Sequence, residues 1–128
     1  MKKCKLTITT TADGQESSIL REGEMEITLT SVTLRYREEN AYVFIVLQGE
    51  RVEIERQGDY SLRLHLKRGE LTDGSLGIGG TDGTIQTFTH KVAYSTSKDS
   101  LLLSLQYDLI ISGETQAMKL RLLGRFTQ

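Results

Sequence analysis

Two alternating apolar segments joined by a short polar connector occupy residues 101–126, and they constrain the fold more than any other part of the chain. In the first segment every second residue is apolar or aromatic: Leu101, Leu103, Leu105, Tyr107, Leu109 and Ile111. The second segment has the same period, with Met118, Leu120, Leu122 and Phe126 on one face and Lys119, Arg121 and Arg125 on the other. A period of two is typical of a strand with one buried face. Because the connector contains Gly113, the sequence predicts a β-hairpin.

The same period recurs along most of the chain, in segments separated by short polar or glycine-containing connections. These segments cover residues 4–12, 15–30, 32–36, 41–47, 52–54, 62–66, 75–78 and 84–94. No segment has the sustained apolar stripe of an amphipathic helix, so we expect little or no α-helix. About nine or ten strands would leave long unpaired edges in an open sheet, which favours closure into a barrel or a sandwich. The short hairpin connections favour an up-and-down barrel, and the lack of repeats and linkers indicates one domain over residues 1–128.

Glycines and a change of apolar phase mark several connections. Gly23 is expected to form a bulge or bend within its strand, and the phase change across Thr30 and Ser31 favours a tight turn over a bulge. The chain from Gly69 to Gly83 is rich in glycine. We interpret it as two Asp-Gly turns that flank a short edge strand, or alternatively as a flexible flap at a barrel mouth. It matches neither the dinucleotide fingerprint nor the phosphate-binding loop.

The segment Ala41–Leu47 is apolar on both faces of the predicted strand. One interpretation is a strand whose outer face is covered by another part of the chain. The other is an exposed patch through which two copies form a homodimer.

Composition excludes several classes of function. The formal net charge of −1 predicts no nucleic-acid partner, since proteins that bind a phosphate backbone are normally basic. The longest apolar run is far shorter than the roughly 20 residues that cross a bilayer, and no signal peptide is expected at the start of the chain, so we expect no membrane partner. Cys4 is the single cysteine, which rules out an intramolecular disulfide and favours the cytoplasm. One cysteine and two histidines predict neither a metal site nor a cofactor.

The two histidines differ in their surroundings. His65 lies on the charged face of its segment and is expected at the surface. His90 is in phase with Phe88, Val92 and Tyr94, so we expect it inside the barrel. There it would be a core residue that hydrogen-bonds to the protein, a polar anchor for a ligand in the lumen or, least favoured, a general base. Cys4 is interpreted as a half-buried thiol and not as a nucleophile.

Tyrosines and one arginine complete the set of candidate site residues. Tyr36, Tyr94 and Tyr107 are each in phase with apolar neighbours, so their hydroxyls would lie inside the barrel or at its rim, or serve packing alone. Arg56 stands two residues before Gly58 at the end of a segment, where it would close one end of the barrel or be exposed.

The order of these features resembles the YwiB-like family of small bacterial proteins of unknown function. The segments that carry the resemblance are Ile54–Gly58, Leu62–Gly69, Thr84–Val92, Leu103–Leu109, Gly113 and Met118–Leu123. The resemblance implies a calycin-type β-barrel related to lipocalins and fatty-acid-binding proteins, whose lumens often hold small apolar ligands. The chain departs from the pattern at residues 76–80, where it has Leu-Gly-Ile-Gly-Gly in place of an aromatic residue, a threonine and a glycine.

The expected fold is therefore a single all-β domain, an antiparallel, calycin-like (lipocalin-like) up-and-down barrel of about eight to ten strands. The leading functional hypothesis is a non-enzymatic barrel that binds a small, largely apolar ligand in its lumen, with His90, Tyr94, Tyr107, Tyr36 and Arg56 as candidate contacts. The alternative is a protein-interaction or homodimerisation module that uses Ala41–Leu47. An enzyme is the third hypothesis, because the sequence contains no evident acid–base pair or activated nucleophile.

Overall fold

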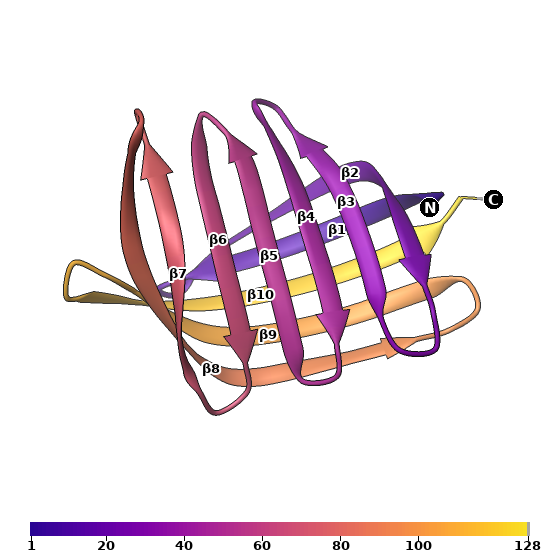
Figure 1. Ribbon diagram of the computed structural model, residues 1–128. Helices are drawn as coiled ribbons and strands as arrows, with labels where there is room; N and C mark the ends of the chain where they lie inside the picture. Colours follow the sequence, from indigo (N-terminus) through magenta and orange to yellow (C-terminus); the bar gives the residue numbers. More distant parts are fainter. Residues whose placement is uncertain (128) are drawn as a thin grey trace.

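The computed structural model describes residues 1–127, which form ten strands and no helix (Figure 1). The strands are β1 (Lys2–Ala12), β2 (Gln15–Ile27), β3 (Val32–Glu38), β4 (Ala41–Gln48), β5 (Arg51–Gly58), β6 (Tyr60–Lys67), β7 (Leu71–Ile78), β8 (Thr81–Thr96), β9 (Ser100–Ile111) and β10 (Glu114–Phe126).

Each strand pairs antiparallel with its neighbours in the chain, and β1 pairs with β10 to close the sheet. The predicted antiparallel up-and-down barrel is confirmed, and it is the closed barrel that the calycin-type resemblance implies. Closure pairs both outer strands of the sheet, although residues 15–22 of β2 pair with β1 alone and residues 91–96 of β8 pair with β9 alone. The two arms of the hairpin in residues 101–126 are β9 and β10, and they pair from Ile111↔Glu114 to Ser100↔Arg125.

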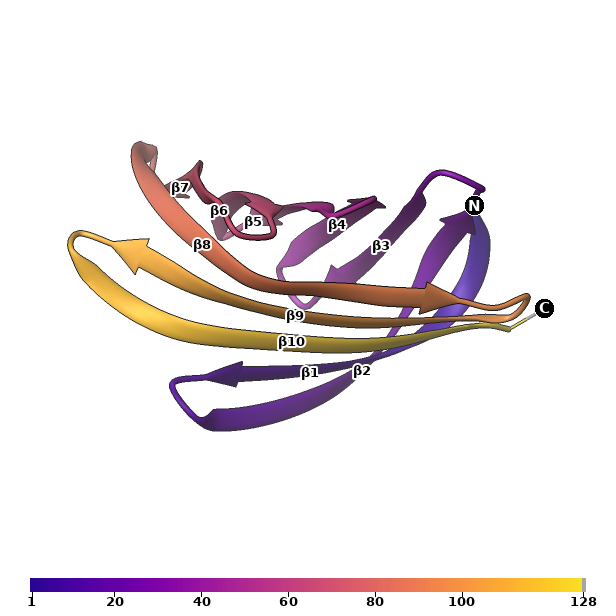
Figure 2. The same cartoon turned by 90° about the horizontal axis from the view of Figure 1, so that it is seen from below.

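The barrel is flattened into two layers that cross steeply. Figure 1 shows β3–β7 running across β8, β9, β10 and β1, and Figure 2 shows the two layers one above the other. The long strands β2 and β8 belong to both layers, because β2 pairs with β1 and then with β3, while β8 pairs with β7 and then with β9. Strongly bent strands of this kind form the corners where two crossed layers meet.

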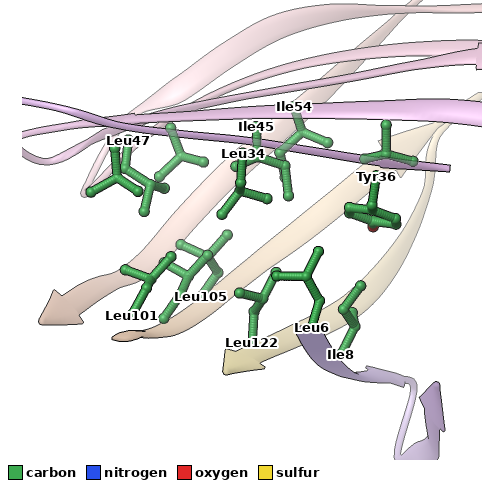
Figure 3. Close-up of a cluster of buried hydrophobic side chains, with 14 of the residues drawn as sticks. Leu6, Ile8, Leu34, Tyr36, Ile45, Leu47, Ile54, Leu101, Leu105 and Leu122 are labelled. Atoms are coloured by element: carbon green, nitrogen blue, oxygen red, sulfur yellow. The ribbon is translucent and has the colours of Figure 1, made fainter. Parts of the chain in front are cut away.

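Apolar side chains from both layers fill the space between them. Figure 3 shows Leu101, Leu105 and Leu122 of one layer facing Leu34, Ile45 and Leu47 of the other. None of these side chains is more than 2% exposed. Burying one such side chain stabilises a fold by about 1.5–3 kcal/mol relative to leaving it exposed. Packing between the apolar strand faces that the alternation predicted therefore holds the two layers together.

Five connections lie together at one end of the barrel, which we call the hairpin end. They are Asp13–Gly14, Glu39–Asn40, Asp59, Gly79–Gly80 and Ser112–Gly113. Asp13 and Gly14 both have positive φ, and so do Ser112 and Gly113. Two consecutive residues with positive φ are typical of the tight turns that match the twist of a hairpin.

One local prediction needs correction and two are confirmed. The pairing of β2 with β1 runs without a shift from Gln15 to Met25, so Gly23 forms no bulge, but it marks the alternative, a bend, where β2 begins to pair with β3. The strand ends at Ile27 instead of continuing to Thr30, and a hydrogen bond of 2.9 Å from the Thr28 N–H to the Ser31 carbonyl closes the predicted turn.

The glycine-rich segment Gly69–Gly83 forms β7, the turn after it and the start of β8, which together make a regular hairpin. Asp73-Gly74 lies inside β7 and Asp82-Gly83 inside β8, so neither pair forms the predicted turn. The turn is at Gly79–Gly80, where both φ angles are positive. Since β7 pairs with β6 and β8, it is not an edge strand, and the interpretation as a flap is wrong as well.

The outer face of β4 is open to solvent. Tyr42 is 65% exposed and Phe44 is 40% exposed, whereas Val43 and Ile45 between and beside them are buried in the core. No other part of residues 1–127 covers this face, so the first interpretation of Ala41–Leu47 is wrong.

Candidate functional site

Inward-facing side chains near the hairpin end are less completely buried than those in the middle of the barrel. The side chains there alternate in phase with the core but remain partly accessible: Ile19, Leu62, Leu76, Leu109, Ile111, Met118 and Leu120. Cross-strand pairs such as Leu109↔Gln116 and Leu62↔Leu76 place them around the inner wall, next to the connections of the hairpin end. They form an apolar inner wall that begins where the packed core ends, and we call this region the mouth.

Tyr36 and Tyr107 bring two hydroxyl groups into this apolar surrounding. Tyr36 comes from β3 and Tyr107 from β9, and they are 8% and 7% exposed. Figure 3 shows the Tyr36 ring pointing from its own layer toward Leu6 and Ile8 of the opposite one. The register pairs Tyr36 with Gly23, and a Cβ at position 23 would lie 3.1 Å from the Tyr36 Cβ. A residue without a side chain is thus required beside Tyr36.

Burial makes ionisation of both tyrosines unfavourable. It raises the pKa of Tyr107 to about 12. Burial also raises the pKa of Tyr36, and the nearby Glu38 carboxylate adds to the effect. Both side chains are therefore neutral phenols near pH 7, able to donate and to accept a hydrogen bond. Within residues 1–127, neither hydroxyl makes a hydrogen bond with the protein.

Thr89 adds a third polar group without a partner. It is fully buried, it is the register partner of Tyr107, and its Oγ1 atom has no hydrogen bond within the described residues. The neighbouring inward threonine, Thr87, donates or accepts a 2.8 Å bond with Thr72. A buried hydroxyl without a partner is costly, so the contrast between the two threonines marks Thr89 as a polar group that the described residues leave unsatisfied.

Arg56 lies at the rim of the mouth with all three of its nitrogens engaged. Its Nε lies 3.3 Å from Glu38, and its two Nη atoms donate to the Tyr60 carbonyl and the Asp59 carboxylate, each at 2.8 Å. The guanidinium also stacks on the Tyr60 ring, 3.7 Å from its centre. The Arg56 guanidinium holds the pKa of the Asp59 carboxyl below its ordinary value. Arg56 therefore uses three of its five N–H donors to fasten the β5–β6 turn to β3.

His90 does not lie in the lumen, contrary to the prediction. The pairing of β8 with β9 shifts between Thr89 and Lys91, so His90 is the extra residue of a β-bulge. A bulge reverses the alternation of side chains beyond it. As a result Ile85, Thr87 and Thr89 face inward before the bulge, Val92 and Tyr94 face inward after it, and Phe88 and His90 share the outer face.

The outer surroundings of His90 are well defined. Its Nε2 atom lies 2.8 Å from an Asp108 oxygen, and its ring meets that of Phe88 edge to face at 5.0 Å. The His90 and Asp108 side chains are 49% and 31% exposed. The pair therefore fixes the bulge to β9 from outside, away from the lumen.

Tyr94 points inward but stands apart from the other tyrosines. It pairs with Leu103, four residues along β9 from Tyr107, which corresponds to roughly 13 Å. The structure therefore brings Tyr36 and Tyr107 to the lumen, places Arg56 at its rim, and separates Tyr94 and His90 from them.

Three residues near the mouth were not among the predicted site residues. Thr89 could not be assigned to the inner face, because the bulge that follows it shifts the alternation of side chains by one residue. Glu38 continues the inward series of Val32, Leu34 and Tyr36, and its alternation could have identified it. Arg21 alternates with Ile19 and Gly23 in the same way, and it is the register partner of the buried Leu6.

Other candidate chemistry does not assemble. Cys4 is 2% exposed, more deeply buried than predicted, and burial raises the pKa of its thiol. His65 is at the surface, as predicted, next to Glu53 at 3.3 Å. Among residues 1–127 no three His, Cys, Asp or Glu side chains are grouped so that they could hold a metal ion. The described part of the chain also contains no helix long and apolar enough to cross a membrane.

Comparison with known proteins gives a family and a fold. The family model described as a domain of unknown function, DUF1934, matches residues 3–122. The crystal structure of the ywiB protein from Bacillus subtilis is similar with a TM-score of 0.85 and 15% sequence identity, over 99% of this chain and 93% of that one. At this identity the likeness concerns the fold alone. No curated protein matches the chain.

Proposed function

Because the chain belongs to the DUF1934 family of domains of unknown function, its membership brings no activity with it, and we propose a function from the lumen instead. The predicted YwiB-like family is thereby confirmed. The proposal is a non-enzymatic barrel that binds a small, largely apolar ligand through the mouth at the hairpin end.

The observation that carries the proposal is the pair of unpartnered tyrosine hydroxyls. As residues, Tyr36 and Tyr107 are more than nine-tenths buried, and no hydrogen bond within residues 1–127 uses their oxygens. Thr89 Oγ1 is the one fully buried side-chain oxygen without a partner among the described residues, so both phenol oxygens keep some accessible surface and are free to hydrogen-bond with a ligand. A ligand with one hydrogen-bonding group would satisfy them, while its apolar part would cover the accessible side chains of the mouth.

The walls of the mouth suit such a ligand. Leu76, Leu109 and Met118 come from three strands and are only partly buried, so a ligand in contact with them would remove apolar surface from water. That contribution amounts to about 25 cal/mol per Å². Arg56 is occupied by Glu38, Asp59 and Tyr60, so it would frame the opening and the tyrosines would make the specific contacts.

Binding of a fluorescent apolar dye, anilinonaphthalene sulfonate, tests the proposal together with native mass spectrometry of the freshly purified chain. Leu76→Trp, which fills the mouth from β7, is expected to lower dye affinity at least about tenfold. Ser75→Trp places the same ring on the outer face of the same strand and should leave the affinity unchanged. Equal affinities of the two variants would refute the proposal.

A second candidate function is a protein-interaction module that uses the outer face of β4. It is supported by the exposure of Tyr42 and Phe44, since a solvent-facing pair of aromatic rings on one strand is typical of contact surfaces. A homodimer through Ala41–Leu47 would be dissociated by Phe44→Ser. Sedimentation velocity checks this, and a wild-type monomer would contradict it.

A further inference from the structure

The outer face of β2, β1, β10 and β9 is organised in rows that cross the four strands. Figure 1 shows these strands side by side, and their registers define the rows. The central row is largely apolar and consists of Leu20, Thr7, Leu123 and Leu102. Leu20 is 74% exposed and Leu102 is 57% exposed. Thr7, Leu123 and Leu102 line a shallow hollow of about 510 Å³ in the middle of this face.

Charged rows flank the apolar row on both sides. On one side the row is Glu22, Lys5 and Arg125. On the other side, beyond Ser18, Thr9 and Arg121, the row is Glu16, Thr11 and Lys119. In both charged rows the acid stands on β2 and a base stands on β10, with β1 between them. We call the outer-face residues of β2, β1 and β10 the β1 face.

This arrangement is complementary to itself. A two-fold axis parallel to β1 and lying just above it would place β2 of one copy on β10 of the other without shifting any row. Glu22 would then oppose Arg125, Leu20 would oppose Leu123, and Glu16 would oppose Lys119. We propose that the β1 face is the interface of a symmetric homodimer of this chain, an isologous contact in which each pair occurs twice.

Within one chain these charges are largely unused. Only Glu16 has an ion-pair partner on the β1 face, Arg121 at 3.5 Å, and both side chains are more than half exposed. Glu22, Lys5, Arg125 and Lys119 form no ion pair within the described residues. Exposed pairs contribute little by themselves, whereas complementary charges across an interface select the partner and fix its register.

Lys5 is a base that the two-fold axis would bring close to its counterpart in the other copy, as is Lys3 two residues before it on β1. Lys5 stands on β1 beneath the axis, and its register partner Glu22 lies one strand away in the same chain. That separation is about 4.8 Å between neighbouring strands, within reach of a flexible lysine side chain. Lys5 would therefore turn toward Glu22 of its own chain and away from Lys5 of the other copy.

The size of the face suits a weak dimer. The β1 face has three strands spaced about 4.8 Å apart and some 11 residues long at about 3.3 Å per residue, or roughly 14 by 36 Å. The resulting area of roughly 500 Å² per partner is that of a small interface, below the roughly 800 Å² of a standard one. A second copy fits better than a polyanion, because every base of the two charged rows has an acid in its own row.

The inference is independent of the lumen ligand and of the outer face of β4, and reciprocal charge reversal tests it. Glu22→Lys would face Arg125 in its own homodimer, and Arg125→Glu would face Glu22. Each variant alone is expected to weaken dimerisation at least about tenfold, since like charges then oppose each other twice. In an equimolar mixture, the lysine introduced at position 22 of one chain would meet the glutamate introduced at position 125 of the other. A heterodimer should therefore form with nearly wild-type affinity.

Sedimentation equilibrium of the full chain up to about 100 µM measures these affinities. Glu53→Lys reverses a charge on the outer face of β5 and is the matched control, expected to dimerise like the wild type. Leu20→Ser, expected to weaken the dimer without any charge change, serves as a second variant, and thermal melts show that each variant is folded.

Four outcomes would overturn the inference. They are a monomeric wild type, reversal variants that dimerise normally, a mixture that stays monomeric, and a dimer that Phe44→Ser dissociates while Glu22→Lys does not. Binding of heparin to a monomeric wild type through Arg125 would assign the face to polyanions instead.

Discussion

Thr89 on β8 is the register partner of Tyr107 on β9, and both side chains face the lumen with hydroxyl groups that no described residue satisfies. One residue further along β8, the bulge leaves two consecutive side chains, His90 and Lys91, outside the barrel. The polar part of the candidate site therefore lies beside the irregularity that forms a corner of the barrel.

Thr89→Val is expected to stabilise the protein by about 1 kcal/mol, because it removes a buried hydroxyl without a partner and keeps the side-chain shape. Thr87→Val is the matched control. It removes the 2.8 Å bond between Thr87 and Thr72 and should destabilise the protein by about 1 kcal/mol. Urea denaturation measures both changes. A destabilisation by Thr89→Val as large as that of the control would mean that Thr89 has a partner.

Stability is expected to fall steeply at high pH. The pKa of Tyr107 is about 12 in the folded chain, above the value of about 10 in an unfolded one. Between these values the folded state binds the proton and the unfolded state loses it, so the free energy of unfolding falls by about 1.4 kcal/mol per pH unit. Below about pH 10 this loss is absent. Tyr107→Phe should reduce the slope measured by denaturation between about pH 10 and 12, whereas Tyr42→Phe, at an exposed position, should not.

Gly23→Ala is expected to destabilise the protein by about 1–3 kcal/mol through overpacking. A Cβ at position 23 would collide with the Arg35 carbonyl oxygen and lie 3.1 Å from the Tyr36 Cβ. Gly83→Ala is the control, because its Cβ would have nothing closer than the Leu76 oxygen at 4.0 Å. Thermal unfolding of both variants checks the expectation, and similar losses would contradict the role of Gly23 as a point of close approach.

Arg56→Met is expected to raise the pKa of the Asp59 carboxyl, because the guanidinium that holds it low is removed. In the wild type the lowered pKa contributes stability that is present above the unfolded pKa and is lost as pH falls through the folded one. The variant should therefore lose less stability on acidification. Carboxyl resonances followed by NMR through the acid range report the change directly. Arg63→Met, which breaks an exposed pair with Glu55, should leave the Asp59 titration unaltered.

His90→Ala is expected to leave dye binding in the mouth unchanged, since the ring is on the outer face with Asp108 and Phe88. Tyr107→Phe should weaken the binding of a ligand with a hydrogen-bonding group by about threefold to tenfold, as one neutral hydrogen bond is lost. Fluorescence titration compares the two. A loss in His90→Ala that equals the loss in Tyr107→Phe would place the ligand elsewhere.

Contacts between residues far apart in the sequence could not be predicted from local patterns. The inward placement of Tyr36 and Tyr107 follows from alternation with their neighbours, and the structure confirms it. The prediction for His90 failed because alternation alone cannot reveal a bulge, which changes the phase by one residue. The rim position of Arg56 could not be derived either, because Glu38 approaches it from another hairpin.

The sequence by itself determined the strand content and the antiparallel order, because a period of two and short turns are local properties of the chain, and the number of strands favoured a closed barrel. Only the tertiary structure decided which side chains share the mouth and which outer rows stand in register. Those relations depend on how β2 and β8 bend between the two layers, with Gly23 at a close approach on β2 and the bulge at His90 on β8. Local alternation specifies the faces of the strands, whereas closure of the barrel specifies which faces meet.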